Sequence, residues 1–321
     1  MEIKNMRILF LGTPEFAVGI LKQLLSNKCN VVAVVTAADQ PAGRGLKLQQ
    51  SAVKQFAIEN NLKVLQPVKL RDEFFLDEVR SLHIDLQIVV AFRMMPQILW
   101  AMPPLGTFNL HASLLPQYRG AAPINWAIIN GEKQTGVTTF FLQQQIDAGN
   151  IILQQTVQID DADTAGILHD KLMEAGGALV IKTVETIANG TVKTINQNEL
   201  SIEPLHDAPK LFKQHLLINF NKPVTAVYNH IRGLSPYPAA FFEFTTHDQK
   251  LYSMKVYGCS YETATVNFDG IIYTDNKTYL NIYCLGGILR LTNIQLAGKK
   301  RMDTTEFLRG FNMSNCKLIY R

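Results

Sequence analysis

The sequence predicts an α/β fold in which a doubly wound, mostly parallel sheet is followed by a small antiparallel β-barrel. In the first half, short apolar runs alternate with segments whose apolar residues recur at helical spacing, which is typical of a parallel sheet with helices on both faces. After Gly190, short β-rich runs are separated by glycines and Asn-Asp-type turns, and this pattern indicates an antiparallel barrel. The 321 residues, of which 47% are hydrophobic, suffice for two such cores.

The elements of the predicted parallel sheet follow one another along the chain. Residues 31–36 and 86–91 are almost unbroken apolar runs, as expected of strands covered on both faces. In residues 14–25 the apolar side chains return every three or four positions, which predicts an amphipathic helix. The expected strands are 7–11, 31–36, 86–91, 107–110, 137–142 and 151–156. The expected helices are 14–25, 51–60, 72–82 and 164–188, with a further helix beginning at Pro123.

The second half of the chain is expected to form a separate domain. Residues 191–209 are polar and contain Pro204 and Pro209, as is typical of a linker. We therefore divide the chain into an α/β domain (1–190), a linker (191–209) and a barrel domain (210–321). The barrel domain is expected to hold a short helix from Val224 and strands at 241–245, 251–257, 270–273, 279–284 and 288–295.

Composition and motifs exclude several classes of protein. No apolar run approaches the roughly 18 residues of a membrane span, and the N-terminus lacks signal-peptide architecture, so we expect a cytosolic protein. The four cysteines show neither CxxC nor Cys/His spacing, which argues against a disulfide framework and a zinc site. Gly12-Thr13-Pro14 follows the first strand, but GxGxxG and GxxxxGK[ST] are absent, so neither a dinucleotide cradle nor a P-loop is expected.

Charge is unevenly distributed. Residues 208–321 contain 14 Lys and Arg against 7 Asp and Glu, a net charge of +7, whereas residues 1–207 carry −3. A basic C-terminal third suggests that a polyanion binds there. A few extra surface lysines would give the same count, so charge alone does not decide between a binding face and an ordinary surface.

Polar side chains cluster between residues 106 and 150. Asn109 and His111 are two apart at the end of a predicted strand, so they point to the same face, where ligands of open α/β sheets bind. Asp147 follows in a predicted turn. These groups suit acyl transfer to an amine, because Asn and His N–H groups stabilise an oxyanion and the carboxylate or imidazole relays a proton. GxSxG is absent, which favours direct transfer. On spacing alone, a structural Asn and His and a turn-forming Asp explain the same residues.

The chain resembles the folate-dependent formyltransferases over almost its whole length. The most specific block is NLHASLLPQYRGAAPINWAIINGEKQTGVT (109–138), with IDAGNII (146–152) downstream. Further matching segments are FLGTPEFAV (10–18), QPAGRGLKLQQSAVK (40–54), QPVKLRD (66–72), VVAF (89–92) and IQLAGKK (294–300). The PAGRG loop and the C-terminal segment point to the branch of the family that acts on tRNA.

The resemblance implies a Rossmann-like catalytic domain, an OB-like barrel and a set of site residues. It implies that Asn109 and His111 hold the formyl oxygen, while Asp147 orients His111 and assists proton transfer. The residues that would line the folate site are Ser113, Leu114, Leu115 and Pro116. The main chain of four further residues would bind the pterin edge: Val89, Val90, Ala91 and Phe92.

The resemblance also implies a tRNA-binding surface. Arg44, between two glycines, matches a mobile basic loop that enters the acceptor end of initiator tRNA, and Lys47 would add a phosphate contact. Lys299, Lys300 and Arg301 form the densest basic cluster of the chain, in the domain expected to dock tRNA. Taken alone, that triplet is explained as well by a solvated hairpin end.

The sequence departs from the family pattern at several positions. Gln40 stands where a basic residue is usual, Ala112 replaces a glycine, and Gln117-Tyr118 replaces Arg-Trp. None of these changes removes Asn109, His111 or Asp147, so we expect the chemistry to be intact. The affinity for tRNA stays open because of Gln40 and Gln117.

The activity that the resemblance implies is transfer of the formyl group of 10-formyltetrahydrofolate to the α-amine of methionyl-initiator tRNA. No other organic cofactor, metal, membrane or obligate protein partner is expected. A sugar-nucleotide formyltransferase would share the three polar residues but would have no use for PAGRG or a basic barrel. A formate-releasing hydrolase would use water as acceptor, and a non-catalytic RNA-binding protein would not need the three residues intact.

Overall fold

The computed structural model describes residues 2–42, 47–200 and 204–319, and the chain divides into two compact units. The first comprises Met1–Gly120, Gln134–Gln158 and His169–Asp207. The second comprises Ala121–Lys133, Ile159–Leu168 and Ala208–Arg321. The second unit thus takes in two segments from the range 1–190 as well as the C-terminal third.

The first unit is built on a seven-stranded sheet with the order β10-β9-β7-β6-β1-β2-β5. Only β9 runs antiparallel to its neighbours, so the predicted mostly parallel sheet is confirmed. The strands are β1 (Ile8–Gly12), β2 (Val31–Val35), β5 (Val64–Leu65), β6 (Leu86–Val90), β7 (Thr107–His111), β9 (Gln134–Phe141) and β10 (Ile151–Gln158). β7 lies between β6 and β9, well inside the sheet, and ends at His111.

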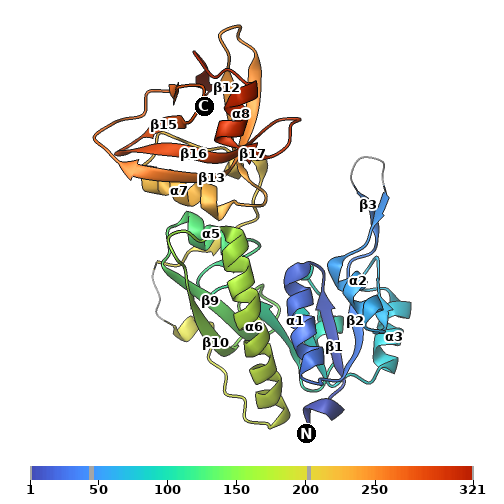
Figure 1. Ribbon diagram of the computed structural model, residues 1–321. Helices are drawn as coiled ribbons and strands as arrows, with labels where there is room; N and C mark the ends of the chain where they lie inside the picture. Colours follow the sequence, from blue (N-terminus) through green and yellow to red (C-terminus); the bar gives the residue numbers. More distant parts are fainter. Residues whose placement is uncertain (1, 43–46, 201–203, 320–321) are drawn as a thin grey trace. The chain divides into compact units, whose positions relative to one another are not determined.

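Helices cover both faces of this sheet. On one face α1 and α6 lie side by side (Figure 1), so closely that a Cβ on Gly19 would meet the side chain of Met173. On the other, Phe75, Leu76 and Val79 of α3 pack into a cluster with buried strand residues. The helices are α1 (Glu15–Ser26), α2 (Ala52–Glu59), α3 (Glu73–Ser81), α4 (Gln97–Trp100) and α6 (Ala165–Ala188). Within the described ranges, no helix combines the length and the apolar character that a membrane crossing needs.

Several short elements were not expected from the sequence. They are the paired strands β3 (Gln40–Ala42) and β4 (Lys47–Gln49), the paired strands β8 (Arg119–Gly120) and β11 (Asp207–Ala208), strand β5, helix α4 and the 3-10 turns η1 (Ile3–Asn5), η2 (Gln197–Glu199) and η3 (Lys213–Leu216). Elements of two to four residues carry no periodic signal, because a period needs several repeats to be recognised.

The second unit contains an antiparallel sheet with the order β14-β15-β16-β13-β12-β18, and β17 pairs with β16. A bridge between Ile271 and Lys317, with a hydrogen bond of 3.1 Å from Leu318 N to Gly270 O, joins the β14 edge to the β18 edge and closes the barrel. The strands are β12 (Ala240–Thr245), β13 (Leu251–Thr263), β14 (Ile272–Thr274), β15 (Leu280–Cys284), β16 (Gly287–Leu296), β17 (Met302–Asp303) and β18 (Lys317–Ile319). Every second residue of β12 is buried, as expected for a strand with one face on a core. The predicted barrel is confirmed.

Helices of the second unit pack against the barrel and against each other. α7 (Val224–Gly233) buries Val224, Val227 and Ile231 in the barrel core, and α8 (Thr304–Gly310) adds Phe307 and Leu308. α5 (Pro123–Ile129) lies against α7, where Asn125 Nδ2 donates to the carbonyl of Gly233 at 2.8 Å. The predicted helix start at Pro123 is confirmed.

His230 on α7 makes the stability of the second unit sensitive to pH. Its Nε2 is enclosed and has no hydrogen-bond partner in the described residues. Burial, with the nearby Lys222 charge, lowers the pKa of His230 to about 4. The unfolded chain, with a pKa near 6.5, takes up the proton first. The stabilisation is therefore complete above pH 6.5 and is lost as the pH falls toward 4, by up to about 3 kcal/mol.

This loss is expected in the free energy of unfolding measured by urea titration between pH 7 and 4. In His230→Leu the drop should be smaller by that amount, because an apolar side chain has no proton to gain and leaves no buried nitrogen without a partner. Equal drops in the two proteins would contradict the assignment.

Candidate functional site

The end of strand β7 carries the two polar residues predicted to act on the formyl group. Asn109 is half-buried, and among the described residues its side-chain amide has no hydrogen-bond partner. His111 is 6% exposed, and its Nε2 lies 2.8 Å from the carbonyl oxygen of Tyr118. Because a carbonyl only accepts, this bond places the imidazole proton on Nε2 and leaves Nδ1 of the neutral ring as the basic nitrogen.

The predicted folate loop, residues 113–116, is pinned to the sheet by hydrogen bonds. Thr138 of β9 donates from Oγ1 to Ser113 O (2.7 Å) and accepts from Leu115 N (3.1 Å). Gln154 of β10 donates to Leu115 O at 2.9 Å. Ser113 is fully buried, and its hydroxyl donates to Gln117 O at 2.6 Å. The Ser113 hydroxyl thus holds the loop in shape, while Leu115 and Pro116 are buried and Leu114 is partly exposed.

The segment predicted to hold the pterin edge follows strand β6. Val89 and Val90 are buried strand residues, whereas Ala91 is exposed with a φ of 46°. From Phe92 to Met95, no main-chain group has a hydrogen-bond partner within the described part of the chain. Such open N–H and C=O groups beside apolar side chains can bind the edge of a flat heterocycle.

Asp147 lies in the turn between β9 and β10, as predicted. Its φ is 50°, and its Oδ2 accepts from the main-chain N–H of Gly120 at 3.1 Å. Two residues later, a Cβ on Gly149 would lie 1.7 Å from the carbonyl oxygen of Phe141, so only glycine fits there. The side-chain hydrogen bonds of His111 and Asp147 therefore go to Tyr118 and Gly120, which flank Arg119 in one short segment.

Two residues of this site were not anticipated from the sequence. Arg119 donates from Nε and Nη2 to Oε1 of Gln197, at 3.0 and 2.6 Å. Gln197 lies in the polar stretch predicted to be a linker, yet it is 2% exposed. A buried glutamine among polar neighbours leaves no periodic or motif signal, so only the fold identifies it.

The predicted tRNA-contacting loop is only partly within the described residues. Arg44 lies outside them, and of Lys47 only the main chain, in β4, is described. The base of the β3–β4 hairpin is anchored next to Asp39, whose carboxylate contacts Lys54 Nζ at 2.5 Å and Gln66 Nε2 at 2.8 Å. Hydrogen bonds from Gln66 and Lys54 lower the pKa of the Asp39 carboxyl. This anchor holds the base of the hairpin on the rest of the first unit.

The predicted basic triplet lies in the turn between β16 and β17 of the second unit. Lys299, Lys300 and Arg301 are all exposed. The Arg301 guanidinium lies 4.3 Å from the ring centroid of Tyr257 and hydrogen-bonds the side chain of Asn293. Arg301 is thus held by the barrel, whereas the two lysines extend from its surface and are available to phosphates.

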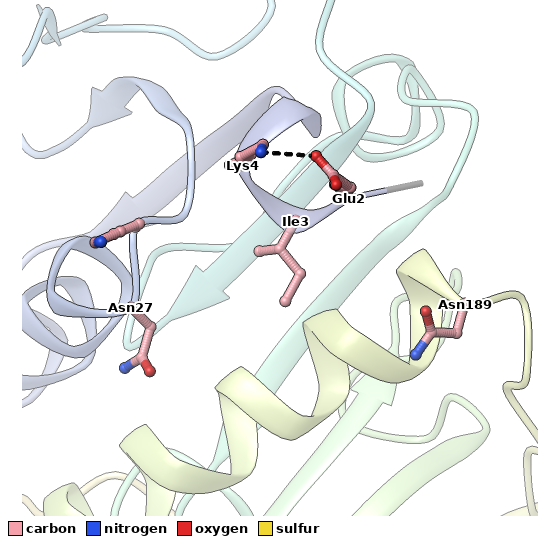
Figure 2. Close-up of a pocket in the computed structure, with 6 residues that line it drawn as sticks. Glu2, Ile3, Lys4, Asn27 and Asn189 are labelled. Carbon is pink, nitrogen blue, oxygen red and sulfur yellow. Dashed lines mark ion pairs between the residues drawn. The ribbon is translucent and has the colours of Figure 1, made fainter.

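A pocket of about 750 Å³ lies in the first unit. Figure 2 shows it, lined by Glu2, Ile3, Lys4, Asn27, Lys28 and Asn189, with an exposed ion pair between Lys4 and Glu2. None of the predicted site residues lines it. Elsewhere in the described residues, His, Cys, Asp and Glu side chains form no group of three or more that could hold a metal ion.

Comparison with known proteins gives matches over both units. A family described as formyl transferase matches residues 6–184, and its C-terminal domain matches residues 210–312. A methionyl-tRNA formyltransferase from Bacteroides thetaiotaomicron is 51% identical over 318 residues, covering 98% of each chain. One from Flavobacterium psychrophilum is 49% identical over 320 residues, covering 99% of this chain and 100% of the other. A solved N-formyltransferase from Helicobacter canadensis, in complex with folinic acid and dTDP-3-aminofucose, shares the fold with a TM-score of 0.65 at 22% identity, covering 89% of this chain and 98% of that one.

Proposed function

This chain belongs to the formyl transferase family, and from that membership we propose that it transfers the formyl group of 10-formyltetrahydrofolate to the α-amine of methionyl-initiator tRNA. The choice of acceptor is supported by relatives named methionyl-tRNA formyltransferase, which share about half of their residues with this chain over nearly its whole length. The choice of chemistry is supported by one observation above all. Within the described part of the chain, the side-chain amide of Asn109 has no partner, and it lies two residues before a histidine whose Nε2 is bonded to a carbonyl oxygen.

In the proposed mechanism, the methionine nitrogen attacks the formyl carbon and the carbonyl electron pair moves onto oxygen. The Asn109 amide, which has no partner among the described residues, donates to that oxygen as it becomes negative. Collapse of the tetrahedral intermediate breaks the bond between the formyl carbon and the folate nitrogen, which takes up a proton. No covalent enzyme intermediate is needed.

Proton transfer falls to His111 and Asp147. The attacking amine becomes cationic as its bond to carbon forms, and it must lose a proton before the intermediate collapses. Nδ1 of His111 is the basic nitrogen of the ring, because Nε2–H is bonded to Tyr118. We propose that the Asp147 carboxylate assists this transfer from the adjoining turn, while Gly120 N–H holds its Oδ2.

The donor would bind through the open main chain after β6 and the pinned loop after β7. Main-chain groups from Phe92 to Met95 are available to the pterin edge, with Val89, Val90 and Ala91 leading into them. Leu114 and its neighbours Ser113, Leu115 and Pro116 would line the ring. We further propose that residues 1–190 carry out catalysis, that residues 191–209 link the two domains and that residues 210–321 bind tRNA. The proposed site of action is the cytoplasm, where charged initiator tRNA is found.

The test is formylation of charged initiator tRNA with 10-formyltetrahydrofolate, using free methionine and an amino-sugar nucleotide as control acceptors. Formylmethionyl-tRNA should form, while the controls gain no formyl group. Formate release without an acceptor would instead indicate a hydrolase. Transfer to the sugar nucleotide at an equal or higher rate would overturn the choice of acceptor.

The exposed lysines of the barrel give a separate prediction. In Lys299→Ala/Lys300→Ala, KM for tRNA should rise about tenfold near physiological salt. The slope of log KM against log salt should fall by about 1 to 2, because tRNA binding releases fewer counterions when two phosphate contacts are missing. kcat should stay within about twofold. Arg301 is left intact because it is bonded to the barrel itself.

A matched control removes the same charge elsewhere on the barrel. Lys277 and Lys250 are both exposed and lie in turns away from the β16–β17 turn in sequence. In Lys250→Ala/Lys277→Ala, KM should move by less than about twofold, since no specific phosphate contact is lost. Equal effects in the two double variants would show that net charge, rather than this turn, sets the affinity for tRNA.

A further inference from the structure

We infer that Gln197, in the stretch between the two domains, is a positioning residue for Asp147. The inference rests on the proposed function, in which the Asp147 carboxylate assists proton transfer. It concerns four residues that form a closed ring, linked by hydrogen bonds and by the peptide bond between Arg119 and Gly120: Gln197, Arg119, Gly120 and Asp147.

Gln197 uses all of its hydrogen-bonding capacity inside the protein. Its Oε1 accepts from Arg119 Nε and Nη2, at 3.0 and 2.6 Å. Its Nε2 donates to the carbonyls of Asp147 and Gly149, at 2.9 and 2.8 Å. A glutamine amide offers two donors and two acceptor sites, so none is left over. Full satisfaction at 2% exposure makes this a rigid contact rather than a surface bond.

The segment that carries Gln197 is itself fastened beside the Asp147 turn. Ile195 and Ile151 exchange two main-chain hydrogen bonds, of 2.8 and 2.9 Å, just before η2 begins at Gln197. Because Ile151 is the first residue of β10, this bridge carries the glutamine over the turn formed by residues 146–149.

The same amide fixes both partners of the hydrogen bond that holds the carboxylate. On one side it holds Arg119, whose neighbour Gly120 donates to Asp147 Oδ2 at 3.1 Å. On the other it holds the carbonyl of Asp147, whose φ of 50° is unfavourable for a residue with a side chain. Without the two donated bonds, the turn can relax toward a commoner conformation and the carboxylate moves with it.

Gln197→Glu distinguishes the bonds that Gln197 accepts from Arg119 from the bonds that it donates to the carbonyls of Asp147 and Gly149. A carboxylate still accepts from Arg119, but it has no N–H for the carbonyls of Asp147 and Gly149 and repels them. We expect kcat to fall roughly 100-fold, because a displacement of about 1 Å in a reacting group costs that much. KM for both substrates should stay within about threefold. Gln197→Met, of similar length and without hydrogen bonds, should behave alike and serves if the charged variant folds poorly.

Asn196→Ala is the matched control. Its Oδ1 accepts from Asn198 N at 3.0 Å and caps η2 without touching the ring of four residues. Its kcat should stay within about twofold of wild type. If it loses as much turnover as Gln197→Glu, the effect comes from general loosening of η2, and the inference is overturned.

A double-mutant cycle and an exchange measurement complete the test. In an Asp147→Ala background, Gln197→Glu should lower kcat by less than about a further threefold, because it acts through a group already removed. A full additional loss would overturn the inference. Amide exchange at Gly120 should be faster in Gln197→Glu and unchanged in Asn196→Ala, whatever the acceptor of the reaction proves to be. Unchanged exchange at Gly120 would refute the positioning role, whether or not the wild-type protein formylates tRNA. Failure of the wild-type protein to formylate tRNA would refute the proposed function separately.

Discussion

His111→Ala is expected to lower kcat by about 1000-fold, within the range that a positioned acid–base group contributes, while the folate donor binds with a dissociation constant within about threefold of wild type. The loss follows from the position of the imidazole at the end of β7, where Nδ1 is its basic nitrogen. Donor binding should survive, because the loop after β7 is held by bonds to Thr138 and Gln154 rather than to His111. Single-turnover formylation and a direct titration of the folate would measure the two quantities.

His111→Gln distinguishes two roles of the imidazole, which are accepting a proton and donating a hydrogen bond to Tyr118. A glutamine amide can still donate to the Tyr118 carbonyl, but it has no basic nitrogen to accept a proton. Its kcat should therefore be as low as that of His111→Ala. Recovery of most of the turnover in His111→Gln would show that the histidine only shapes the loop, and full activity in both variants would remove it from the site.

Gly149→Ala is expected to cost more than about 3 kcal/mol in the free energy of unfolding, because overpacking against an unyielding main chain exceeds the usual cost of an added methyl group. The new Cβ would lie 1.7 Å from Phe141 O, where β9 ends and β10 is about to begin. Neither strand can retreat without losing pairing in the sheet. Urea titration would measure the loss, and kcat should fall as well because Asp147 lies in the same turn.

Gly310→Ala is the control for the glycine change itself. Gly310 ends α8, and no atom of the residues that the structure describes lies within 4 Å of the Cβ it would acquire. Its stability should change by less than about 1 kcal/mol, and in the stabilising direction if the helix end gains from alanine. Similar losses in the two variants would contradict the steric argument for Gly149.

Strand β13 shows how a local breaker misleads a prediction from sequence. The strand was expected to end at residue 257, because glycine follows and polar residues come after it. It continues to Thr263, and the irregular pairing with β16 falls between Val256 and Cys259. Gly258 is therefore a bulge within the strand rather than its end. Pairing with β16 supplies hydrogen bonds that the local sequence of the strand does not predict.

Part of the candidate site was also predicted from the sequence. Asn109 and His111 were expected on one face at the end of a strand, and Asp147 in a turn. The roles of these three residues in catalysis stay predictions. The side-chain hydrogen bonds of Asp147 to Gly120 and of His111 to Tyr118 were not predicted. The expected role of Asp147 in orienting His111 stays a prediction. The departure at Gln117 also gains a contact, since its side chain bonds the main chain of Pro204 and His206, at 2.8 Å each.

The sequence by itself determined the order of the strands and helices, the face on which the polar pair lies, the loop that follows, and the family resemblance. These depend on local spacing, because a period of two or of 3.6 residues fixes which side chains share a face. Only the tertiary structure decided the reversal of β9, the closure of the barrel between Ile271 and Lys317, and the burial of Gln197. Arg119 and Gln197 are 78 residues apart, and Gln197 and Asp147 are 50 apart. No local pattern encodes such contacts, since chain packing alone determines which distant polar groups meet.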